Sequence, residues 1–455
     1  MSRSRRPTGT RRSGLAEWSF TMKSRTVRRS SGAYLAELLR NERLGVDELD
    51  RLQSRRAASI ARFAAESTPY YRRLFAERGL DVTRLEDRAE WERIPITDRA
   101  RVKEHEAELR PPGSERFARE ALTGGSTGEP LRTAHDTRVP NLALAWRMYS
   151  WWGVQPWENL ARLGRWGFGR WETVRNGLQW WPTRLLYLDA SRIDAASMRA
   201  FHRAIVRARP ALIEGYAGAV LEFANFLDGE GLTIPTPTAI ATSAAPLPPS
   251  TRRRLEAVFG APAYDEYRGS EVLWMAGECR LQDGLHVFSD ARRIEVVDAH
   301  GRSLPAGEIG DIVVTDLTNR VFPIIRYRLG DRGSLMDGVC ECGITLPRMA
   351  QPEGRTTDVL RLPSGTALNH RMMAMFASHP EAVRLFQVHQ RADYSIVVRV
   401  VLGEGSDAER HVEEAVAKLR RRVAGEVPVT TEYVDTLPYT GAKTKYVISD
   451  VPPRG

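Results

Sequence analysis

The spacing of hydrophobic and polar positions along the chain predicts an α/β protein. Several segments carry apolar residues every three or four positions, which is the spacing of the buried face of a helix. These segments span residues 33–39, 52–65, 139–152, 195–207, 217–227 and 250–259. Between the later segments lie short apolar runs that end in Gly or polar turn residues, at 211–215, 239–242 and 263–269. Strands that alternate with helices in this way predict a parallel sheet with helices packed against it.

The pattern changes after residue 271. Residues 293–297 and 311–315 alternate between apolar and polar on either side of a turn at His300-Gly301, which predicts an antiparallel hairpin. Further on, a strand is expected at 394–402, a helix at 408–423 and another strand at 428–434. We therefore expect a tail over residues 1–30, a large N-terminal domain over residues 31–354 and a small α+β domain over residues 355–455.

Length and composition are those of a globular enzyme. A chain of 455 residues with 42% hydrophobic and 27% charged residues can bury a large core and form two or more domains. No stretch approaches the roughly 18 consecutive apolar residues of a membrane span, so we expect no membrane association. Three cysteines do not suffice for a disulfide framework, which favours a reducing, cytoplasmic location.

The net charge of +10 invites an interpretation as a nucleic-acid-binding protein, but the distribution of the charge argues against it. Residues 1–30 contain nine Lys and Arg and one acidic residue, Glu17, so this segment supplies +8 and leaves +2 for the rest of the chain. It is rich in Arg, Ser and Thr, and we predict a disordered tail. A start at Met22 and a transit peptide are the alternatives for this segment. Nucleic-acid binding would rest on the tail alone, and we expect none.

A loop of small residues is the first candidate for chemistry. Every residue from Thr123 to Gly128 is Gly, Ser or Thr. Glycines permit backbone angles that turn successive N–H groups to one side, and such a nest with added hydroxyls can surround phosphate oxygens. An ordinary flexible loop is the alternative. The Gly-Lys-Ser/Thr ending of a Walker loop is missing, which argues against an NTPase of that type.

Four motifs follow this loop in a characteristic order: Asp265–Glu271, Arg326–Asp331, Gly354–Asp358 and Pro438–Lys443. The loop and these motifs resemble the adenylate-forming superfamily, and more closely the phenylacetate–CoA ligase family with its branch of capsule-biosynthesis proteins and deazaflavin-coenzyme adenylyltransferases. The resemblance runs from about Ser31 to the C-terminus, and it is supported by Pro69-Tyr70-Tyr71, Ile94–Thr97 and Cys340–Gly343. It implies a large multi-layer domain with parallel-rich sheets and a distorted β-barrel, followed by a small α+β lid domain.

The reaction that this resemblance implies joins a carboxylic acid to the α-phosphate of ATP with the help of Mg²⁺. The acyl group would then pass to coenzyme A, a carrier thiol or an amine. One alternative is an adenylyltransferase that releases the AMP adduct. Another is a degenerate, non-catalytic nucleotide-binding protein, because the chain departs from the family pattern at Glu129, Arg268, Thr357 and Ala442. The oligomeric state stays open, with a homodimer as one candidate.

The resemblance also implies a nucleotide site. The phosphate cradle would be Thr123, Gly124, Gly125, Ser126, Thr127 and Gly128, and further contacts would come from Ala244, Ala245, Glu266 and Ser270. Tyr267 would stack on adenine, and Asp331 would accept both ribose hydroxyls. Arg355 is a second candidate for a ribose or phosphate contact. Glu271 would hold Mg²⁺, a hard cation that prefers carboxylate oxygens.

Lys443 is the implied catalytic lysine of the lid domain, and it would enter the site only during adenylation. Only five of the 67 basic residues are lysines, so the chain uses Arg wherever a generic positive charge serves. A lysine kept at this position favours a specific role for a compact, mobile ammonium. Lys445 is the alternative, and Thr357 aligns with the residue at which the lid pivots.

The acid-binding pocket is expected to involve Tyr216, Arg268 and Gly269. Eight of the eleven tryptophans lie between Trp146 and Trp181, either as core residues or as a wall of this pocket. The second interpretation favours an aromatic or bulky apolar acid. Arg268 stands where the family usually has Gly, so it would narrow the pocket or offer a cation to an anionic substrate.

All three cysteines belong to one candidate metal site. Cys340 and Cys342 are two residues apart, and Cys279 and His286 lie in the preceding segment. Together they form a Cys₃His set suited to tetrahedral zinc. The alternative is three reduced, partly buried cysteines without a metal.

Overall fold

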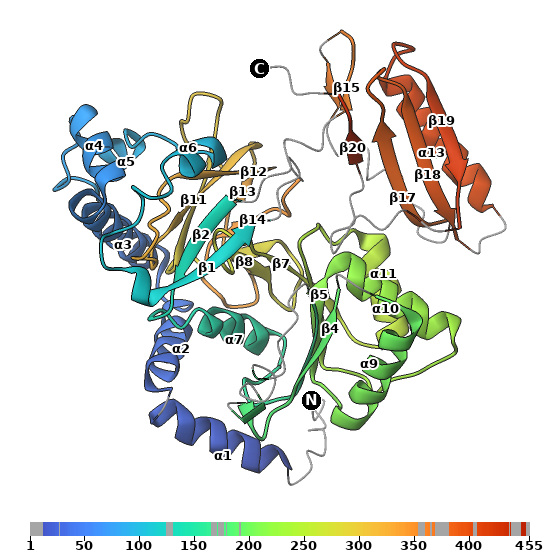
Figure 1. Ribbon diagram of the computed structural model, residues 1–455, viewed down its shortest axis with the longest axis horizontal. Coiled ribbons are helices and arrows are strands. Elements are labelled where there is room, and N and C mark those ends of the chain that lie inside the picture. The colour runs from blue at the N-terminus through green and yellow to red at the C-terminus, as the bar shows by residue number, and fades with distance from the viewer. Residues whose placement is uncertain are drawn as a thin grey trace.

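The computed structural model describes most of the chain (Figure 1). The described residues are 12–26, 28–123, 131–164, 171, 177–178, 180–190, 193–353, 360–364, 366–368, 382–403, 407–435, 437 and 447–451. The glycine-rich loop from Gly124 onward, Arg355, Thr357 and Lys443 lie outside them.

A nine-stranded mixed sheet forms the centre of the large domain, in the order β13-β14-β9-β8-β7-β6-β5-β3-β4. Its parallel part consists of β3 (Leu160–Gly164), β4 (Leu185–Asp189), β5 (Leu212–Tyr216), β6 (Ala239–Ser243) and β7 (Ala263–Tyr267). Its antiparallel part consists of β8 (Ala276–Glu278), β9 (Leu285–Val287), β13 (Leu335–Met336) and β14 (Arg348–Met349). The predicted alternation of strands and helices is thus confirmed as a parallel-rich sheet.

Helices cover both faces of the parallel strands. Figure 1 shows α9 (Ala195–Ala208), α10 (Ala217–Gly229) and α11 (Pro249–Phe259) on one side, with α7 (Leu142–Trp151) on the other. Successive residues of these strands point alternately to the two helix layers, as expected for strands buried on both faces. Leu212 packs into the hydrophobic cluster of α7, whereas its neighbour Ile213 packs into the cluster of α9–α11.

The N-terminal third is helical, except for an antiparallel hairpin that leads into and out of the glycine-rich loop. The helices are α1 (Arg12–Arg25), α2 (Arg29–Asn41), α3 (Val46–Ser67), α4 (Pro69–Glu77), α5 (Arg88–Glu92), α6 (Arg99–Glu104) and the 3₁₀ turn η1 (Glu115–Phe117). The hairpin pairs β1 (Ala118–Thr123) with β2 (Leu131–Asp136).

Helix α1 differs from the disordered tail that was predicted for residues 1–30. The Phe20 ring contacts Trp146 and Trp157, with centroids 5.2 and 5.7 Å apart, and Ser19 is buried. Arg28 lies 4.7 Å above the Trp180 ring. The tryptophan-rich stretch therefore offers an aromatic surface for this segment, a non-local contact that composition does not reveal.

The predicted antiparallel hairpin is confirmed by β10 (Arg292–Val297) and β11 (Gly310–Asp316), and β12 (Tyr327–Gly333) joins as a third strand. Asp331 was expected just after a strand over residues 322–327, but β12 begins only at Tyr327 and contains Asp331. Pro323 lacks an N–H, and Arg326 has a positive φ of 44°, so the residues before Tyr327 do not form a regular strand.

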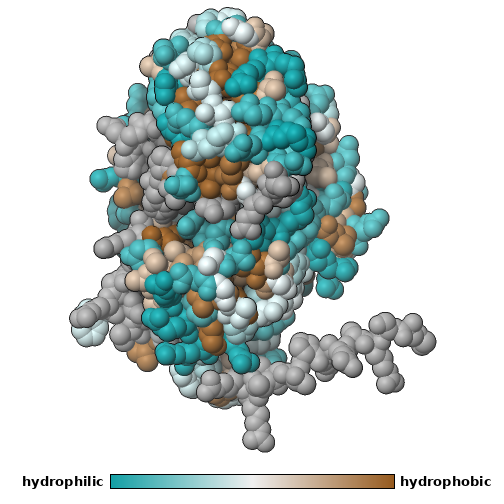
Figure 2. All heavy atoms as spheres, turned by 90° about the vertical axis from the view of Figure 1, so that its right-hand side faces the viewer, coloured by the Kyte–Doolittle hydropathy of each residue, from teal (hydrophilic) through white to brown (hydrophobic). Residues whose placement is uncertain are grey.

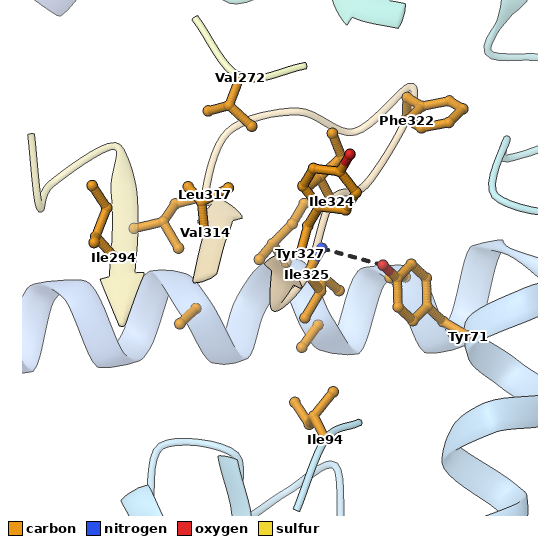
Figure 3. Packing of buried hydrophobic residues seen from close by; sticks show 14 of the residues in the cluster. Tyr71, Ile94, Val272, Ile294, Val314, Leu317, Phe322, Ile324, Ile325 and Tyr327 are labelled. Atoms are coloured by element: carbon orange, nitrogen blue, oxygen red, sulfur yellow. Dashed lines mark hydrogen bonds between the residues drawn. The ribbon is translucent and has the colours of Figure 1, made fainter. Parts of the chain in front are cut away.

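A hydrophobic cluster joins these strands to α3 and α4 (Figure 3). Within it, the Tyr71 hydroxyl accepts a hydrogen bond of 3.2 Å from the Ile325 backbone N–H. This contact supports the backbone just before Arg326 and gives the Pro69-Tyr70-Tyr71 motif a physical role. Thr97, at the end of another supporting motif, forms a β-bridge with Tyr327.

The C-terminal residues form an α+β unit with its own hydrophobic core, apart from the large sheet in Figure 1. It contains β15 (Leu360–Arg361), β16 (Ala367–Leu368), β17 (Val383–Gln390), β18 (Ile396–Leu402), α13 (Ala408–Arg422), β19 (Val429–Tyr433) and β20 (Val447–Ser449). Four of these strands form a sheet in the order β19-β18-β17-β20. The predicted α/β fold with a small α+β C-terminal part is therefore confirmed.

Hydrophilic residues cover much of the face that Figure 2 shows, and hydrophobic residues occupy limited areas between them. Within the described part of the chain, no helix has the length and apolar composition that crossing a bilayer requires.

Candidate active site

The face of the parallel sheet that meets α7 becomes charged toward the carboxyl ends of its strands. Leu160, Leu212 and Ala239 begin this face as buried apolar residues. Two residues later in β3 and β5 stand Arg162 and Glu214, which are register partners. Ser243, the last residue of β6, and Glu266, the last but one of β7, are also register partners. Ligands of open α/β sheets bind beyond the carboxyl ends of the strands, so this edge is the place to look for a substrate.

The side chains at this edge form one cluster, to which α7 contributes Tyr149. The Tyr149 hydroxyl donates to Glu214 Oε2 at 2.5 Å, and Arg162 pairs with the other oxygen of the same carboxylate. Arg268 donates from Nε to Ser243 Oγ at 3.1 Å, and its Nη1 lies 3.5 Å from Glu266 Oε2. Two guanidinium groups and two carboxylates therefore lie together where β3, β5, β6 and β7 end.

The two carboxyl groups of this cluster differ in pKa. Burial acts to raise the pKa of Glu214, but the Arg162 and Arg268 charges and the Tyr149 hydrogen bond outweigh it, so its pKa lies below the usual range. Burial raises the pKa of Glu266 to about 7, because the Arg268 charge offsets only part of the desolvation. Neither oxygen of Glu266 has a hydrogen-bond partner among the described residues.

On the opposite face of β7, the two residues predicted to contact adenosine meet. The Tyr267 hydroxyl donates to Asp331 Oδ2 at 2.8 Å, although the two residues are 64 positions apart in the sequence. Both side chains are half-buried, so they remain accessible to a ligand. The phenol fixes one carboxylate oxygen of Asp331, and a half-buried carboxylate is the kind of acceptor that suits a vicinal diol.

Glu271 follows these residues at the same edge of the sheet. Its Oε1 lies 3.9 Å from Arg99 Nη1, beyond hydrogen-bond distance, and its carboxylate has no hydrogen bond to the described residues. Arg99 comes just after the Thr97 bridge to β12. The carboxylate is therefore supported electrostatically while its oxygens are available to a cation.

His135, on β2, supports the backbone next to Glu271. Its Nε2 hydrogen-bonds the Ser270 carbonyl at 2.9 Å. Burial lowers the pKa of His135 to about 4, so the ring is neutral at physiological pH and Nε2 carries the donated proton. Because β2 leaves the glycine-rich loop, this hydrogen bond links that loop to the Ser270–Glu271 segment.

Other predicted site residues lie nearby. Ala244, directly after β6, has a positive φ of 71°, an unusual conformation for a residue with a Cβ, and the backbone bends at Ala244 and Ala245. The Gly269 N–H donates to the Val272 carbonyl at 2.9 Å. Tyr216 ends β5, but its ring packs against the cluster below α9–α11.

Most of the described tryptophans between residues 146 and 181 are core or surface residues. Trp146 and Trp152 are buried, Trp151 and Trp180 pack against the same cluster, and Trp171 and Trp181 are exposed. The aromatic residue next to the charged cluster is Trp274, whose ring centroid lies 5.9 Å from the Arg268 guanidinium carbon.

Sequence reasoning missed Arg162, Glu214, Tyr149 and Arg99 as site residues. The signal for Glu214 and Arg162 was available, because a charged residue inside an otherwise apolar strand is costly unless it is paired. What the sequence does not reveal is the strand register that pairs them.

The structure brings the four predicted zinc ligands together. Their ligand atoms all lie within 4.8 Å of one another. Cys279 Sγ is 3.8 Å from Cys340 Sγ, and Cys342 Sγ is 3.4 Å from His286 Nε2. Tetrahedral zinc, with bonds of about 2.0–2.3 Å, requires ligand atoms about 3.3–3.8 Å apart, so these separations fit.

The surroundings of this cluster also suit a metal. His286 Nδ1 donates to the Leu346 carbonyl at 3.0 Å, which leaves the Nε2 lone pair directed at the thiols. Burial lowers the pKa of His286 to about 4, so the imidazole is neutral. Backbone N–H groups of Leu281 and Ile344 approach Cys279 and Cys342 at 3.4 Å, as they do around metal thiolates.

The fold is that of an adenylate-forming ligase. The solved structure of 2-hydroxyisobutyryl-CoA ligase in its postadenylation state superposes with a TM-score of 0.76 at 21% identity, over 90% of this chain and 91% of that one.

No protein-family model matches this sequence. Among curated proteins, the phenylacetate–coenzyme A ligase of Thermus thermophilus is 26% identical over 405 residues, which are 87% of each chain. The phenylacetate–coenzyme A ligase of Escherichia coli is 24% identical over 409 residues, 86% of this chain and 91% of its own. These matches confirm the resemblance to the phenylacetate–CoA ligase family that the motifs predicted.

Proposed function

We propose that this protein is an AMP-forming acid ligase, which activates a carboxylic acid with ATP and passes the acyl group to coenzyme A. The contact of Tyr267 with Asp331 carries this proposal, because it holds a carboxylate suited to a ribose diol at the edge where Glu271 and the charged cluster also lie. The similarity over most of the chain to phenylacetate–coenzyme A ligases supports coenzyme A as the acceptor. A carrier thiol or an amine remains the alternative acceptor.

Each part of the site has a role in this reaction. Adenylation gathers negative charge around the α-phosphate, so fixed positive groups and a metal ion stabilise its transition state. Glu271 would hold Mg²⁺, which would supply positive charge to stabilise the phosphates. Thr123–Gly128 would receive the β- and γ-phosphates, and Asp331 and Tyr267 would hold the adenosine. Arg355 would add a contact to ribose or phosphate.

The domain division at about residue 355 and the role of Lys443 belong to the same proposal. The C-terminal unit has a hydrophobic core of its own, which supports its movement as a lid. Lys443 would be the catalytic residue that this lid brings to the site.

Pyrophosphate exchange over a panel of carboxylic acids tests the function. An acid ligase incorporates labelled pyrophosphate into ATP only when an accepted acid is present. Release of AMP on addition of coenzyme A then separates a ligase from an adenylyltransferase, which keeps its AMP adduct. No exchange with any acid, despite ATP binding, would favour the degenerate nucleotide-binding protein instead. We expect an aromatic or bulky apolar acid to be accepted.

Asp331→Ala should weaken ATP binding by roughly 100-fold or more, because both ribose hydroxyls lose the acceptor of a charge-assisted hydrogen bond worth roughly 1.5–3 kcal/mol. Calorimetry with ATP, 2′-deoxy-ATP and 3′-deoxy-ATP measures the effect. The wild type should discriminate against both deoxynucleotides, and the variant should not.

Asp311→Ala serves as the matched control for this experiment. Asp311 lies on the neighbouring strand β11 and pairs with Arg328 at 3.3 Å, so its loss should leave nucleotide discrimination intact. Equal ATP affinity in wild type and Asp331→Ala would remove Asp331 from the nucleotide site.

We also propose that Cys279, His286, Cys340 and Cys342 bind zinc as a structural site. The ion would join the β8–β9 hairpin to the segment that follows β13. All four ligands come from the protein, which is typical of a structural rather than a catalytic zinc.

A further inference from the structure

An acid ligase needs one binding environment for the nucleotide and another for the acid, and the end of β7 separates two such environments. Successive residues of a strand point to opposite faces, so Tyr267 points away from Glu266. Tyr267 lies on the proposed nucleotide side with Asp331. Arg268 follows the end of β7, and its side chain joins Ser243 and Glu266 on the α7 side. The α7 side of this edge is therefore the place for the acid.

Within the charged cluster, the cations are accessible and the anions lie behind them. The side chains of Arg162 and Arg268 are 23% and 20% exposed, whereas those of Glu214 and Glu266 are 0% and 1% exposed. A molecule that enters this region would first meet guanidinium N–H groups.

The two ion pairs of the cluster are unequally satisfied. Arg162 and Tyr149 both hydrogen-bond Glu214, so this carboxylate is fully engaged. Arg268 uses only Nε in a hydrogen bond, to Ser243, and its Nη1 stops 3.5 Å from Glu266. Within the described part of the chain, neither oxygen of the buried Glu266 has a hydrogen bond of regular geometry, and the Trp274 indole N–H, which helps to lower the Glu266 pKa, is itself unsatisfied. Buried polar groups are costly when unsatisfied, so this pair is prepared to accept a ligand group.

Building on the proposed function, we infer that the acid carries a neutral hydrogen-bonding substituent, a hydroxyl or a carboxamide, which Arg268 and Glu266 recognise together. Such a group accepts from the guanidinium and donates to the carboxylate at the same time. A hydrocarbon satisfies neither residue. A second carboxylate would face Glu266, and an ammonium would face Arg268, because the cluster contains as many cations as anions. The Trp274 ring beside Arg268 adds an aromatic surface, which favours a hydroxyaryl acid.

Matched acids test this inference in the pyrophosphate-exchange assay. Phenylacetate and benzoate are compared with their hydroxy derivatives, and with analogues that carry a carboxylate or an aminomethyl group at the same ring position. Wild-type protein should prefer a hydroxy acid over its unsubstituted parent by roughly 100-fold in kcat/KM, because a site built for a hydrogen-bonding group discriminates strongly against its absence.

The variant Glu266→Leu/Arg268→Gly should reduce this preference to within a few-fold. Arg254→Met is the matched control, because Arg254 lies on α11 and pairs with Asp228 away from the strand ends. It should leave the preference unchanged. The ratio between two acids is the readout, so a general loss of activity does not imitate the effect.

The outcomes separate this inference from the proposed function. No exchange with any acid in the wild type would overturn the proposed function. Exchange with equal kcat/KM for hydroxy acids and their parents would overturn only the inference, and the wild type alone suffices for that result. A preference for the dicarboxylate or for the amine would also overturn it, as would a preference for hydroxy acids that survives in the double variant.

Discussion

Lys443→Ala should slow acyl-AMP formation by roughly 100- to 1,000-fold, which is the usual cost of removing one preorganised electrostatic contact from a transition state. The ammonium would neutralise charge that grows on the α-phosphate and the attacking carboxylate. Rapid-quench measurement of acyl-AMP in a single turnover isolates this step. ATP affinity should stay nearly intact, because the proposed adenosine contacts belong to the large domain.

Transfer of the acyl group from preformed acyl-AMP to coenzyme A should also stay nearly intact in this variant. That step develops no comparable charge at the phosphate, and the lid should have rotated away by then. Lys445→Ala is the matched control, and it should slow acyl-AMP formation only slightly. Equal losses in both half-reactions would mean that Lys443 has a structural role, and the rotating-lid mechanism would have to be abandoned for this chain.

Cys340→Ser should release zinc and destabilise the large domain by several kcal/mol, because the free energy of metal binding is part of the free energy of folding. For a protein of this size, such a loss corresponds to a decrease in Tm of roughly 5–10 °C. Elemental analysis of protein purified without added metal, followed by thermal unfolding, measures both effects. A strong chelator should lower the Tm of the wild type in the same way.

Leu281→Ala is the control for the zinc prediction. Leu281 lies two residues after Cys279, but its side chain is exposed and offers no ligand atom. This variant should keep its zinc and its Tm. Wild-type protein that contains no zinc, yet is folded and active, would leave the three cysteines as reduced core residues.

Local periodicity and motif order predicted much of the fold. The helix expected at 217–227 and the strands around it appear within two residues of their predicted ends, because each segment buries one clear apolar face. The start of β12 at Tyr327 could not be predicted, because neither the positive φ of Arg326 nor its buried contacts leave a trace in the residue pattern. Helix α1 was missed because its partners are tryptophans more than 100 positions away.

The residues of the candidate site also divide into those that the sequence could predict and those that it could not. Tyr267, Asp331 and Glu271 could be predicted because they belong to motifs that keep a fixed order. The roles of Arg162, Glu214 and Tyr149 in the site could not be predicted, because their pairing depends on strand register and on the packing of α7. These same residues support Arg268 and Glu266, so the features most informative about the acid are those that only the three-dimensional structure reveals.

A single-turnover experiment with ATP labelled at the α-phosphate tests the central claim most directly. Excess enzyme is mixed with labelled ATP, Mg²⁺ and an acid chosen from the exchange panel, and coenzyme A is added after the first phase. The account predicts that the label first moves into acyl-AMP, up to one equivalent per active site. When coenzyme A is added, the label should move into free AMP, and an acyl thioester should form in equal amount. Label that remains in ATP with every acid, or an AMP adduct that coenzyme A does not discharge, would contradict the assignment as an acid–thiol ligase.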